Sequence, residues 1–284
     1  MVGLTIVAFG GSTPELLVGV VASAHGQGDL AVGNVIGSNI ANIGLVLALA
    51  ALVRGLAVHT RLVSHEIPIM IAATLALVLI ALDGVIGRGD GLLLLAGFSG
   101  FVWISIAQAR QEPEAIEDRY RMLEEAGALE PPRGRRFRDT ALLVLGLAGL
   151  VVGAELVVDA AVAFAQRVGL SELVVGVTIV AIGTSLPELA TSVVASYRGE
   201  AEIAVGNVVG SNIFNAAAII GAAAVTRPLP LNASLAQFEI PVLIGSALLL
   251  LPLARRRFRF GRREGALLLL TYVGFVWIMI ARGT

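Results

Sequence analysis

Two short polar segments interrupt apolar runs of this chain. The first reads GGSTPE at residues 10–15, and the second reads GTSLPE at residues 183–188. Each ends in a carboxylate, Glu15 or Glu188. If these runs cross a membrane, a charge at the centre of a span costs about 2.5–3.5 kcal/mol on insertion scales. An acidic side chain in such a place therefore indicates a cavity or a bound ion.

A serine and a proline accompany each carboxylate. Ser12 and Ser185 stand three residues before the acids, and a proline directly precedes each acid. Proline lacks an amide hydrogen and displaces the carbonyl about four residues back. We therefore expect the carbonyls around residues 8–11 and 181–184 to lose their helical partners. Free carbonyls in a dry site can bind a cation.

A second polar segment follows in each case and adds hydroxyl and amide oxygens. Ser38 and Asn42 belong to the first copy, and Ser211 and Asn215 belong to the second. Residues four apart lie on one face of a helix. Each pair therefore presents its oxygens in the same direction.

Every donor in these segments is a hard oxygen. The chain has no Cys, and none of its three His falls within the polar segments. This donor set disfavours zinc and transition metals, and it favours sodium and calcium, which takes about 6–8 oxygen ligands. Two carboxylates would neutralise one divalent cation, or be neutralised by sodium ions or protons in its absence. This equivalence is the physical basis of exchange, because two bare carboxylates cannot easily cross a low-dielectric barrier.

The polar segments are two copies of one repeat. Residues 5–42 align without a gap to residues 178–215 at a constant offset of 173, with 24 identities in 38 positions. General hydrophobicity would match Leu, Val and Ala, whereas several of these identities are polar. The polar matches and the shared proline are Ser12/Ser185, Pro14/Pro187, Glu15/Glu188, Asn34/Asn207, Ser38/Ser211 and Asn42/Asn215. Polar groups that recur in an apolar setting indicate a binding function.

The composition places the chain in a membrane. It is 57% apolar and only 14% charged, and its mean hydropathy is +0.88. These values lie outside the range of ordinary soluble domains. We predict an all-α polytopic membrane protein with nine transmembrane helices. Their expected bounds are 3–24, 29–53, 66–83, 90–109, 139–166, 171–197, 203–226, 236–253 and 264–281.

The arginines predict how the spans are oriented. All 20 cationic residues are Arg, and the alternating loops place 16 of them on one side and four on the other. The positive-inside tendency puts the arginine-rich side in the cytoplasm and the C-terminus outside. The two copies then have inverted topology, which is typical of a secondary transporter with its site at the midplane. The use of Arg alone and the abundance of Ala favour the plasma (inner) membrane of a prokaryote.

One polar stretch divides the chain. Residues 110–138 carry mixed charges and a Pro-Pro pair, which is typical of a solvated connector. We therefore expect residues 1–109 to form a first repeat of four helices, 110–138 a cytoplasmic linker, and 139–284 a second repeat of five helices.

At the repeated residues the chain resembles the calcium/cation antiporter superfamily, and within it the sodium/calcium exchanger family of prokaryotic type. The resemblance rests on AFGGSTPELL with GNVIGSNIAN, repeated as AIGTSLPELA with GNVVGSNIFN. It implies an inverted-repeat fold of five plus five helices, with four ion sites clustered between the repeats. It also implies that calcium is exchanged for sodium, or in some branches for protons, by alternating access.

The resemblance assigns a role to each repeated polar residue. Glu15 and Glu188 would bind both calcium and sodium, and Asn42 and Asn215 would sit at the central position. The other implied ligands are the carbonyls of Ala8, Gly11, Ala181 and Thr184 and the side chains of Ser12, Ser38, Ser185 and Ser211.

The chain departs from the family pattern in three ways. Gly11 stands where the first repeat of close relatives has Thr, so a hydroxyl ligand is missing although the carbonyl remains. Asn215 stands where several relatives have Asp, an acid associated with potassium dependence in one branch, and its absence argues against potassium co-transport. Third, about 35 residues that would correspond to 139–174 have no counterpart before the first motif helix. We expect either a native start upstream or a nine-helix variant that lacks the first helix.

Other functions are less well supported. The main alternative is a proton/calcium or other cation antiporter. A cation channel is less well supported, because the sequence has two buried acids but no wide polar lining. An enzyme would need a base beside its nucleophile, and no His or Lys stands beside these Ser and Glu residues. We expect Ca²⁺ and Na⁺, with H⁺ as an option, to be the transported ions. We expect no cofactor, no nucleic acid and no obligate protein partner besides the lipid bilayer.

Residues outside the repeats receive plainer interpretations. Glu66 and Glu239 stand at the ends of predicted spans, where solvated positions are the default. Trp103, Trp277 and Tyr272 are predicted to be interfacial or packing aromatics.

Overall fold

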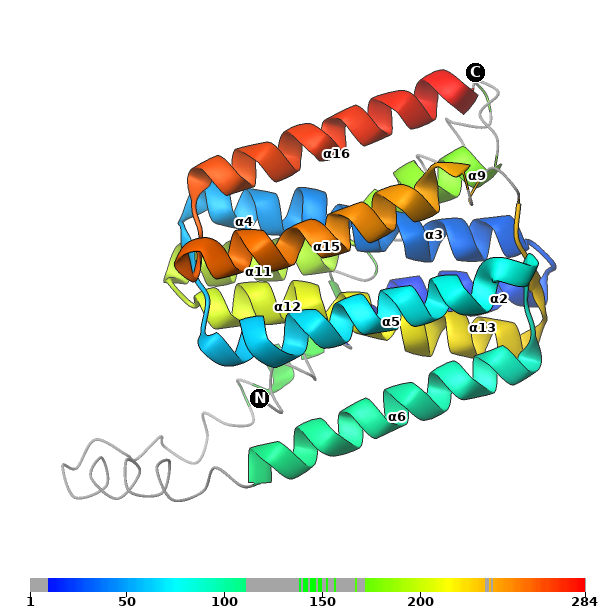
Figure 1. The fold of residues 1–284 in the computed structure, drawn as a ribbon, viewed down its shortest axis with the longest axis horizontal. Coiled ribbons are helices and arrows are strands. Elements are labelled where there is room, and N and C mark those ends of the chain that lie inside the picture. Colours follow the sequence, from blue (N-terminus) through cyan, green and yellow to red (C-terminus); the bar gives the residue numbers. More distant parts are fainter. Residues whose placement is uncertain are drawn as a thin grey trace.

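The computed structural model describes residues 10–110, 172–232 and 237–283, together with Leu235 and scattered residues between 138 and 167. Within these ranges the protein is a bundle of long helices (Figure 1). Ala8, most of the expected linker at 110–138 and most of the expected helix at 139–166 lie outside the described residues.

The first half contributes four helical segments. The first is α2 (Thr13–Ala24). The second runs without interruption through α3 (Gly28–Ala41), the π-helical turn η1 (Asn42–Leu47) and α4 (Ala48–Val53). The third joins η2 (Leu62–Glu66), α5 (Ile67–Ile80) and η3 (Ala81–Asp83), and the fourth is α6 (Arg88–Arg110). All four predicted spans of this half are therefore helical where they are described, apart from a break at Ser12.

The described part of the second half follows the same order. Its first segment joins α9 (Glu172–Val175), η4 (Gly176–Val180), α10 (Ala181–Thr184) and α11 (Leu186–Arg198). Its second joins α12 (Ala201–Ile213), η5 (Phe214–Ile219) and α13 (Ile220–Thr226). The last two are α15 (Glu239–Arg257) and α16 (Arg262–Gly283). The observed bounds lie within a few residues of the predicted ones, because long apolar runs ended by charges define helices well.

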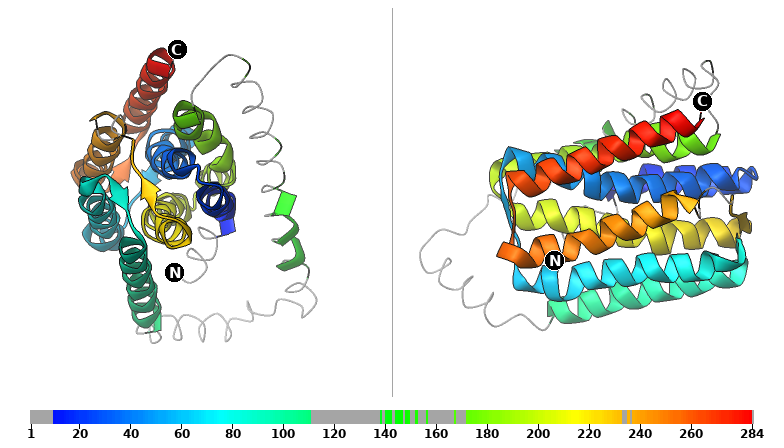
Figure 2. Two further views of the ribbon diagram at one scale, coloured as in Figure 1. Left: turned by 90° about the vertical axis from the view of Figure 1, so that its right-hand side faces the viewer. Right: turned by 45° about the horizontal axis from the view of Figure 1, so that its top comes forward.

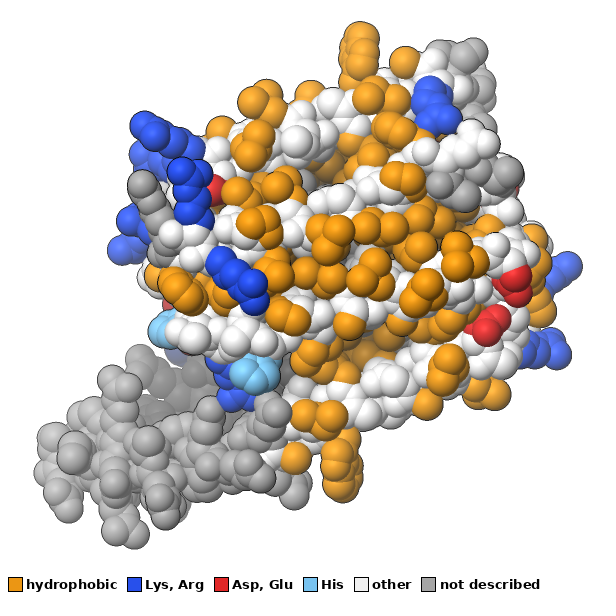
Figure 3. Space-filling view, in the orientation of Figure 1, with side chains coloured by type: hydrophobic (Ala, Val, Ile, Leu, Met, Phe, Trp, Pro, Cys, Tyr) orange, Lys and Arg blue, Asp and Glu red, His pale blue; other side chains and the backbone are white. Residues whose placement is uncertain are grey.

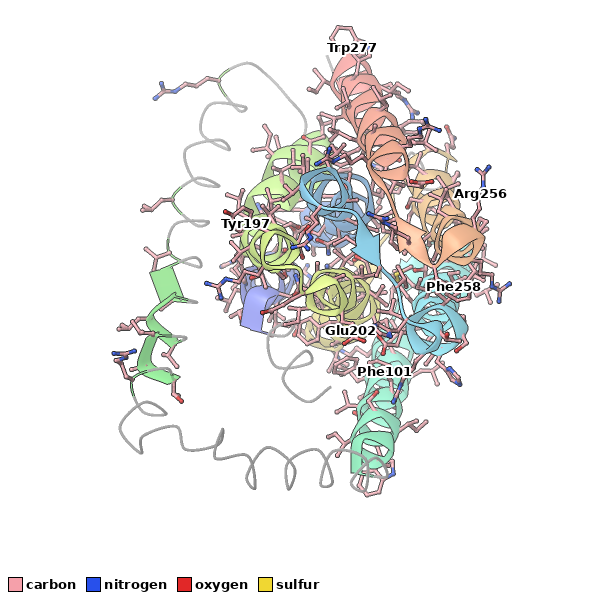
Figure 4. All side chains as sticks on the ribbon, turned by 90° about the vertical axis from the view of Figure 1, so that its left-hand side faces the viewer. Phe101, Tyr197, Glu202, Arg256, Phe258 and Trp277 are labelled. Atoms are coloured by element: carbon pink, nitrogen blue, oxygen red, sulfur yellow. The ribbon has the colours of Figure 1, made fainter. Side chains whose placement is uncertain are left out.

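The surface has the character of a membrane protein. Five of the described helices are long and apolar enough to cross a bilayer. The bent pair Val177–Thr184 and Leu186–Arg198 would be a sixth if the two helices form one span. Apolar side chains cover the middle of the face in Figure 3, and arginines lie towards its two ends. Trp277 on α16 points away from the bundle (Figure 4) and is 75% exposed. Trp103 on α6 is 76% exposed. Aromatic side chains in such positions suit contact with lipid.

The middle of each half is buried, whereas the outer helices are exposed. The end-on view in Figure 2 places α6 and α16 at opposite edges of the bundle, and Gly91 of α6 packs closely against Gly221 of α13. The segments built on α3 and α12 are mostly buried, whereas less than a third of the residues in the segments built on α5, α6 and α16 are buried. Polar residues on α3 and α12 are therefore shielded from lipid and from solvent.

Two short antiparallel strand pairs join the halves. β1 (Leu56–Ala57) pairs with β4 (Arg259–Phe260), with Leu56 opposite Phe260. β2 (Val85–Ile86) pairs with β3 (Leu229–Pro230). Adding 173 to the residues of β1 gives those of β3, and adding 174 to the residues of β2 gives those of β4, since the second half has one extra residue before β4. The two strand pairs are therefore the same contact formed twice: each strand of the first half pairs with the strand of the second half that corresponds to the other.

Hydrogen bonds show the same exchange between the halves. Ser23 Oγ donates to the Ala223 carbonyl at 2.7 Å, and the equivalent Ser196 Oγ donates to the Ala50 carbonyl at 2.6 Å. In Figure 1, α3–α4 and the equivalent α12–α13 run in opposite directions. Each half therefore packs on the other through the same surface.

Glu239 corrects one prediction. It was expected to be solvated at a helix end, but it is 2% exposed. The start of α15 packs against α16, where Phe238 stacks on Phe275 and Arg282 lies 4.9 Å from the Phe238 ring centre. This tertiary contact covers the carboxylate, whereas Glu66 at the equivalent position is half-buried.

Gly37 lies at the closest approach of two helices, and we predict that Gly37→Ala destabilises the protein. A Cβ atom at Gly37 would collide with the Val177 carbonyl and the Ala181 Cβ. Overpacking of this kind costs about 1–3 kcal/mol, so the thermal unfolding midpoint in detergent should fall. Gly97→Ala is the control, since a Cβ there meets no atom within 4 Å. Equal midpoints for the two variants would contradict the close packing.

Candidate cation site

A break in the helix precedes each carboxylate. Ser185 separates α10 from α11, and the helices on either side of it are bent by 52°. Ser12 takes the equivalent place before α2, and each helix that follows has a proline in its first turn. The predicted interruption is therefore confirmed at both motifs, and it places the acids at the start of a new helix.

The expected loss of carbonyl partners does not hold at Ala181. The Ser185 amide donates to the Ala181 carbonyl at 3.2 Å. Pro187 lacks the amide that would bind the Gly183 carbonyl, four residues back, so the proline acts on that carbonyl instead. The Thr184 hydroxyl also donates to the Ala181 carbonyl at 3.4 Å, so this carbonyl has two partners in the structure.

Each carboxylate is held by a serine of the other repeat. Ser12 Oγ donates to Glu188 Oε1 at 2.7 Å, and Ser185 Oγ donates to Glu15 Oε1 at 3.2 Å. These four side chains are 0–2% exposed. The second carboxylate oxygen of each Glu has no hydrogen-bond partner within the described part of the chain. The reciprocal pairing thus orients both acids and leaves one oxygen of each available.

Ser211 and Ser38 complete the hydroxyl groups. Ser211 Oγ lies 3.1 Å from Ser12 Oγ and 3.5 Å from Glu188 Oε1. Ser38 Oγ lies 3.4 Å from Thr184 Oγ1. The structure therefore brings the predicted serines and Thr184 to the two acids, again across the boundary between the halves.

The two central asparagines stand where the helices change to π geometry. Asn42 begins η1, and Asn215 lies in η5. Asn42 Oδ1 and both amide atoms of Asn215 lack hydrogen-bond partners among the described residues. Single π-helical turns occur often at functional sites, and here they accompany amide groups that are free to bind an ion.

Further buried asparagines belong to the same region. Thr184 Oγ1 donates to Asn34 Oδ1 at 3.2 Å, and Asn207 Nδ2 donates to the Glu188 carbonyl at 3.3 Å. Asn39 and Asn212 also lie between the halves, joined by a bond of 3.3 Å from Asn39 Nδ2 to the Asn212 carbonyl. None of these four was predicted as a site residue, although each recurs at the repeat offset. That recurrence of a polar residue was the available signal.

Glu15 and Glu188 lie at the same boundary between the halves, because the serine three residues before each acid donates a hydrogen bond to the other acid. The described residues contain no group of three or more His, Asp or Glu side chains that could hold a metal. The donor set is therefore two carboxylates with neutral oxygens. Ionised carboxylates buried without a counter-charge cost several kcal/mol each, so the arrangement favours uptake of cations or protons.

Gly11 lies directly beside the Glu188 carboxylate. A Cβ atom at Gly11 would lie 3.1 Å from Glu188 Oε1 and 3.8 Å from Oε2. The equivalent residue of the other half, Thr184, carries a hydroxyl that bonds to Asn34. The two acids therefore differ in their surroundings, because one faces a hydroxyl-bearing position and the other faces a bare backbone.

Comparisons with known proteins match both halves of the chain. The sequence profile of the family described as sodium/calcium exchanger protein matches residues 1–107 and 139–281. The putative antiporter CaxA of Alkalimonas amylolytica is 38% identical over 284 residues, which cover 99% of this chain and 88% of the relative. The sodium/calcium exchanger MaX1 of Methanosarcina acetivorans is 30% identical over 312 residues, covering 98% and 88%. The inner membrane protein YrbG of Escherichia coli is 41% identical over 232 residues, covering 80% and 70%.

Solved structures agree with these relatives. The sodium-calcium exchanger NCX_Mj soaked with 100 mM Na⁺ and 10 mM Sr²⁺ matches with a TM-score of 0.77 and 33% identity, covering 98% of this chain and 85% of that one. The same exchanger soaked with zero Na⁺ and Ca²⁺ matches with a TM-score of 0.76, 32% identity and the same coverage. The helical fold of this chain is therefore the fold of that exchanger.

Gly11→Ala should weaken calcium binding. Gly11 is helical, so alanine suits the backbone, but its Cβ would push the Glu188 carboxylate away from Ser12. We expect the calcium concentration for half-saturation to rise about three- to tenfold, the effect of weakening one hydrogen bond to a charged group. Titration of the purified protein with calcium measures it, and Gly97→Ala should leave it unchanged. An unaltered affinity in Gly11→Ala would mean that Glu188 does not contact the ion.

Proposed function

Since this chain belongs to the sodium/calcium exchanger protein family, we propose that it exchanges Ca²⁺ for Na⁺ across the membrane by alternating access. The family consists of transporters and exchangers rather than enzymes. The reciprocal pairing of Glu15 and Glu188 with serines of the opposite repeat supports the proposal most directly. It creates one shared, buried, doubly acidic site from two halves that pack face to face.

The proposed ligands are the residues predicted from the sequence. Glu15 and Glu188 supply the charge, because together they balance one divalent cation. Neutral oxygens complete the shell, since calcium takes about 6–8 oxygen ligands. These are Gly11, Ala8, Ala181 and Thr184 through their carbonyls, Ser12, Ser38, Ser185 and Ser211 through their hydroxyls, and Asn42 and Asn215 through their amides.

Charge balance explains why the two ions exchange. With calcium bound, the two carboxylates are neutralised, and the loaded site can be sealed from water. Without it, two ionised acids in a low-dielectric setting are unfavourable, so sodium ions enter before the empty site can reorient. The buried hydroxyls and amides serve both ions, because both prefer hard oxygen donors.

The proposal extends to the architecture. Residues 1–109 and 139–284 form two repeats of inverted topology within nine spans, and residues 110–138 link them in the cytoplasm. The chain lies in a prokaryotic inner membrane, as for the relative described as an inner membrane protein. Arg54 and Arg61 flank β1, and the arginines between 255 and 263 flank or belong to β4, with which β1 pairs. This concentration of arginine at one end supports a cytoplasmic location for that end and an external C-terminus.

Flux in proteoliposomes tests the exchange. An outward sodium gradient should drive uptake of radiolabelled calcium, and added potassium should leave the rate unchanged because Asn215 replaces the acid linked to potassium dependence. A pH gradient in place of the sodium gradient should drive little uptake. Uptake that follows pH and ignores sodium would establish proton/calcium exchange instead.

Neutral variants of the two acids test the site. Glu15→Gln and Glu188→Gln each remove one of the two charges that balance calcium, so we expect calcium flux to fall to background. Glu202→Gln is the matched control, because this carboxylate lies on the surface of α12, 57% exposed, paired with His59 at 2.9 Å. Full flux in either buried variant would refute the site.

A further inference from the structure

One chain of hydrogen bonds leads from the central site to α5. Asn42 Nδ2 donates to Asn212 Oδ1 at 3.1 Å, and Asn212 Nδ2 donates to Met70 Sδ at 3.5 Å. All three residues are 0–2% exposed. They come from η1, α12 and α5, so these two hydrogen bonds join three helical segments at the core of the bundle.

The sulfur atom determines which way the Asn212 amide faces. A thioether accepts hydrogen bonds weakly and donates none, so it favours the NH₂ end of an amide. With Nδ2 toward Met70, Asn212 Oδ1 faces Asn42 and accepts its NH₂ group. Asn42 Oδ1 is then left without a partner in the described structure. The oxygen of Asn42, rather than its nitrogen, is thus available to a cation.

The equivalent contacts of the other half are different. The repeat offset relates Asn212 to Asn39, Asn42 to Asn215, and Met70 to Leu243. Leucine has no acceptor. Asn39 Nδ2 donates instead to the Asn212 carbonyl at 3.3 Å, and its Oδ1 has no partner among the described residues. Asn215 consequently has neither amide atom bonded in that part of the chain.

We propose that Met70 and Asn212 are positioning residues that hold the Asn42 oxygen toward the bound cation, and that the second half lacks this device because Leu243 replaces the sulfur. The inference rests on the proposed function, since it assigns a cause to the geometry of one proposed ligand. Asn42 is ordered before the ion arrives, whereas Asn215 must be ordered by it. Preorganised ligands increase affinity because ordering costs are met in advance.

Met70→Leu tests the role of the sulfur. The exchange nearly conserves volume and is usually well tolerated in a core, and it installs the residue that the other half already has. We expect the calcium concentration for half-maximal uptake to rise about three- to tenfold, as for loss of one hydrogen bond. The maximal rate and the thermal midpoint should stay near those of the wild type. An unchanged half-maximal concentration would overturn the proposal.

Leu243→Met is the matched control. It makes the reverse exchange at the equivalent position, where Asn39 is not bonded to Asn215, so it should not raise the half-maximal calcium concentration. A rise as large as that in Met70→Leu would assign the effect to core packing and overturn the proposal. Met70→Gln returns an acceptor on a side chain of similar length, and it should restore the affinity that Met70→Leu loses. Affinity as poor as in Met70→Leu would also count against the proposal.

Calcium titration in detergent separates this proposal from the exchange function. If the wild type binds calcium but shows no sodium-driven flux, the exchange function fails, and Met70→Leu must still bind calcium about three- to tenfold more weakly. If flux is sodium-driven and requires Glu15 and Glu188, but Met70→Leu matches the wild type in both assays, the exchange function stands and the positioning role is wrong.

Discussion

Two carboxylates buried side by side without a basic partner in the described structure impose the main constraint on this protein. Glu15 and Glu188 are 0% and 1% exposed, and each keeps one oxygen without a hydrogen bond in the described residues. Such a pair is tolerable only if cations or protons neutralise it and if surrounding dipoles hold it in place. The serine of the opposite repeat meets the second requirement for each acid. The binding site therefore exists only when the two halves are packed together.

The packing of the halves follows from the same requirement. Water must be excluded around the acids, so the helical segments around them approach closely, as where Gly37 of α3 meets Val177 and Ala181 and an added carbon has no room. The halves use equivalent contacts twice, through Ser23 and Ser196 and through the two strand pairs. Because the same contacts form twice, with the two halves exchanged, the two sides of the site have similar structures.

The halves differ at many aligned positions, and two of the differences lie beside proposed ligands. Gly11 leaves bare backbone beside Glu188, whereas Thr184 carries a hydroxyl. Met70 gives Asn212 an acceptor that Leu243 cannot give Asn39. Both differences change which oxygens are fixed and which are free without altering the helices around them. These two differences therefore lie where they can change the proposed coordination of the ion.

The helices, the repeat, the helix break and the acidic pair were all predictable from the sequence, because hydrophobic runs, proline and recurring polar residues act locally along the chain. The burial of Glu239 and the retained partner of the Ala181 carbonyl were predicted wrongly. The serine-to-glutamate pairing across the halves and the Met70–Asn212–Asn42 chain were not predicted. Each of these depends on which atoms meet between segments far apart in sequence, such as Ser12 and Glu188, 176 residues apart. Hydrophobic pattern determines that such segments are buried, but only the packed tertiary structure determines which polar atoms face one another.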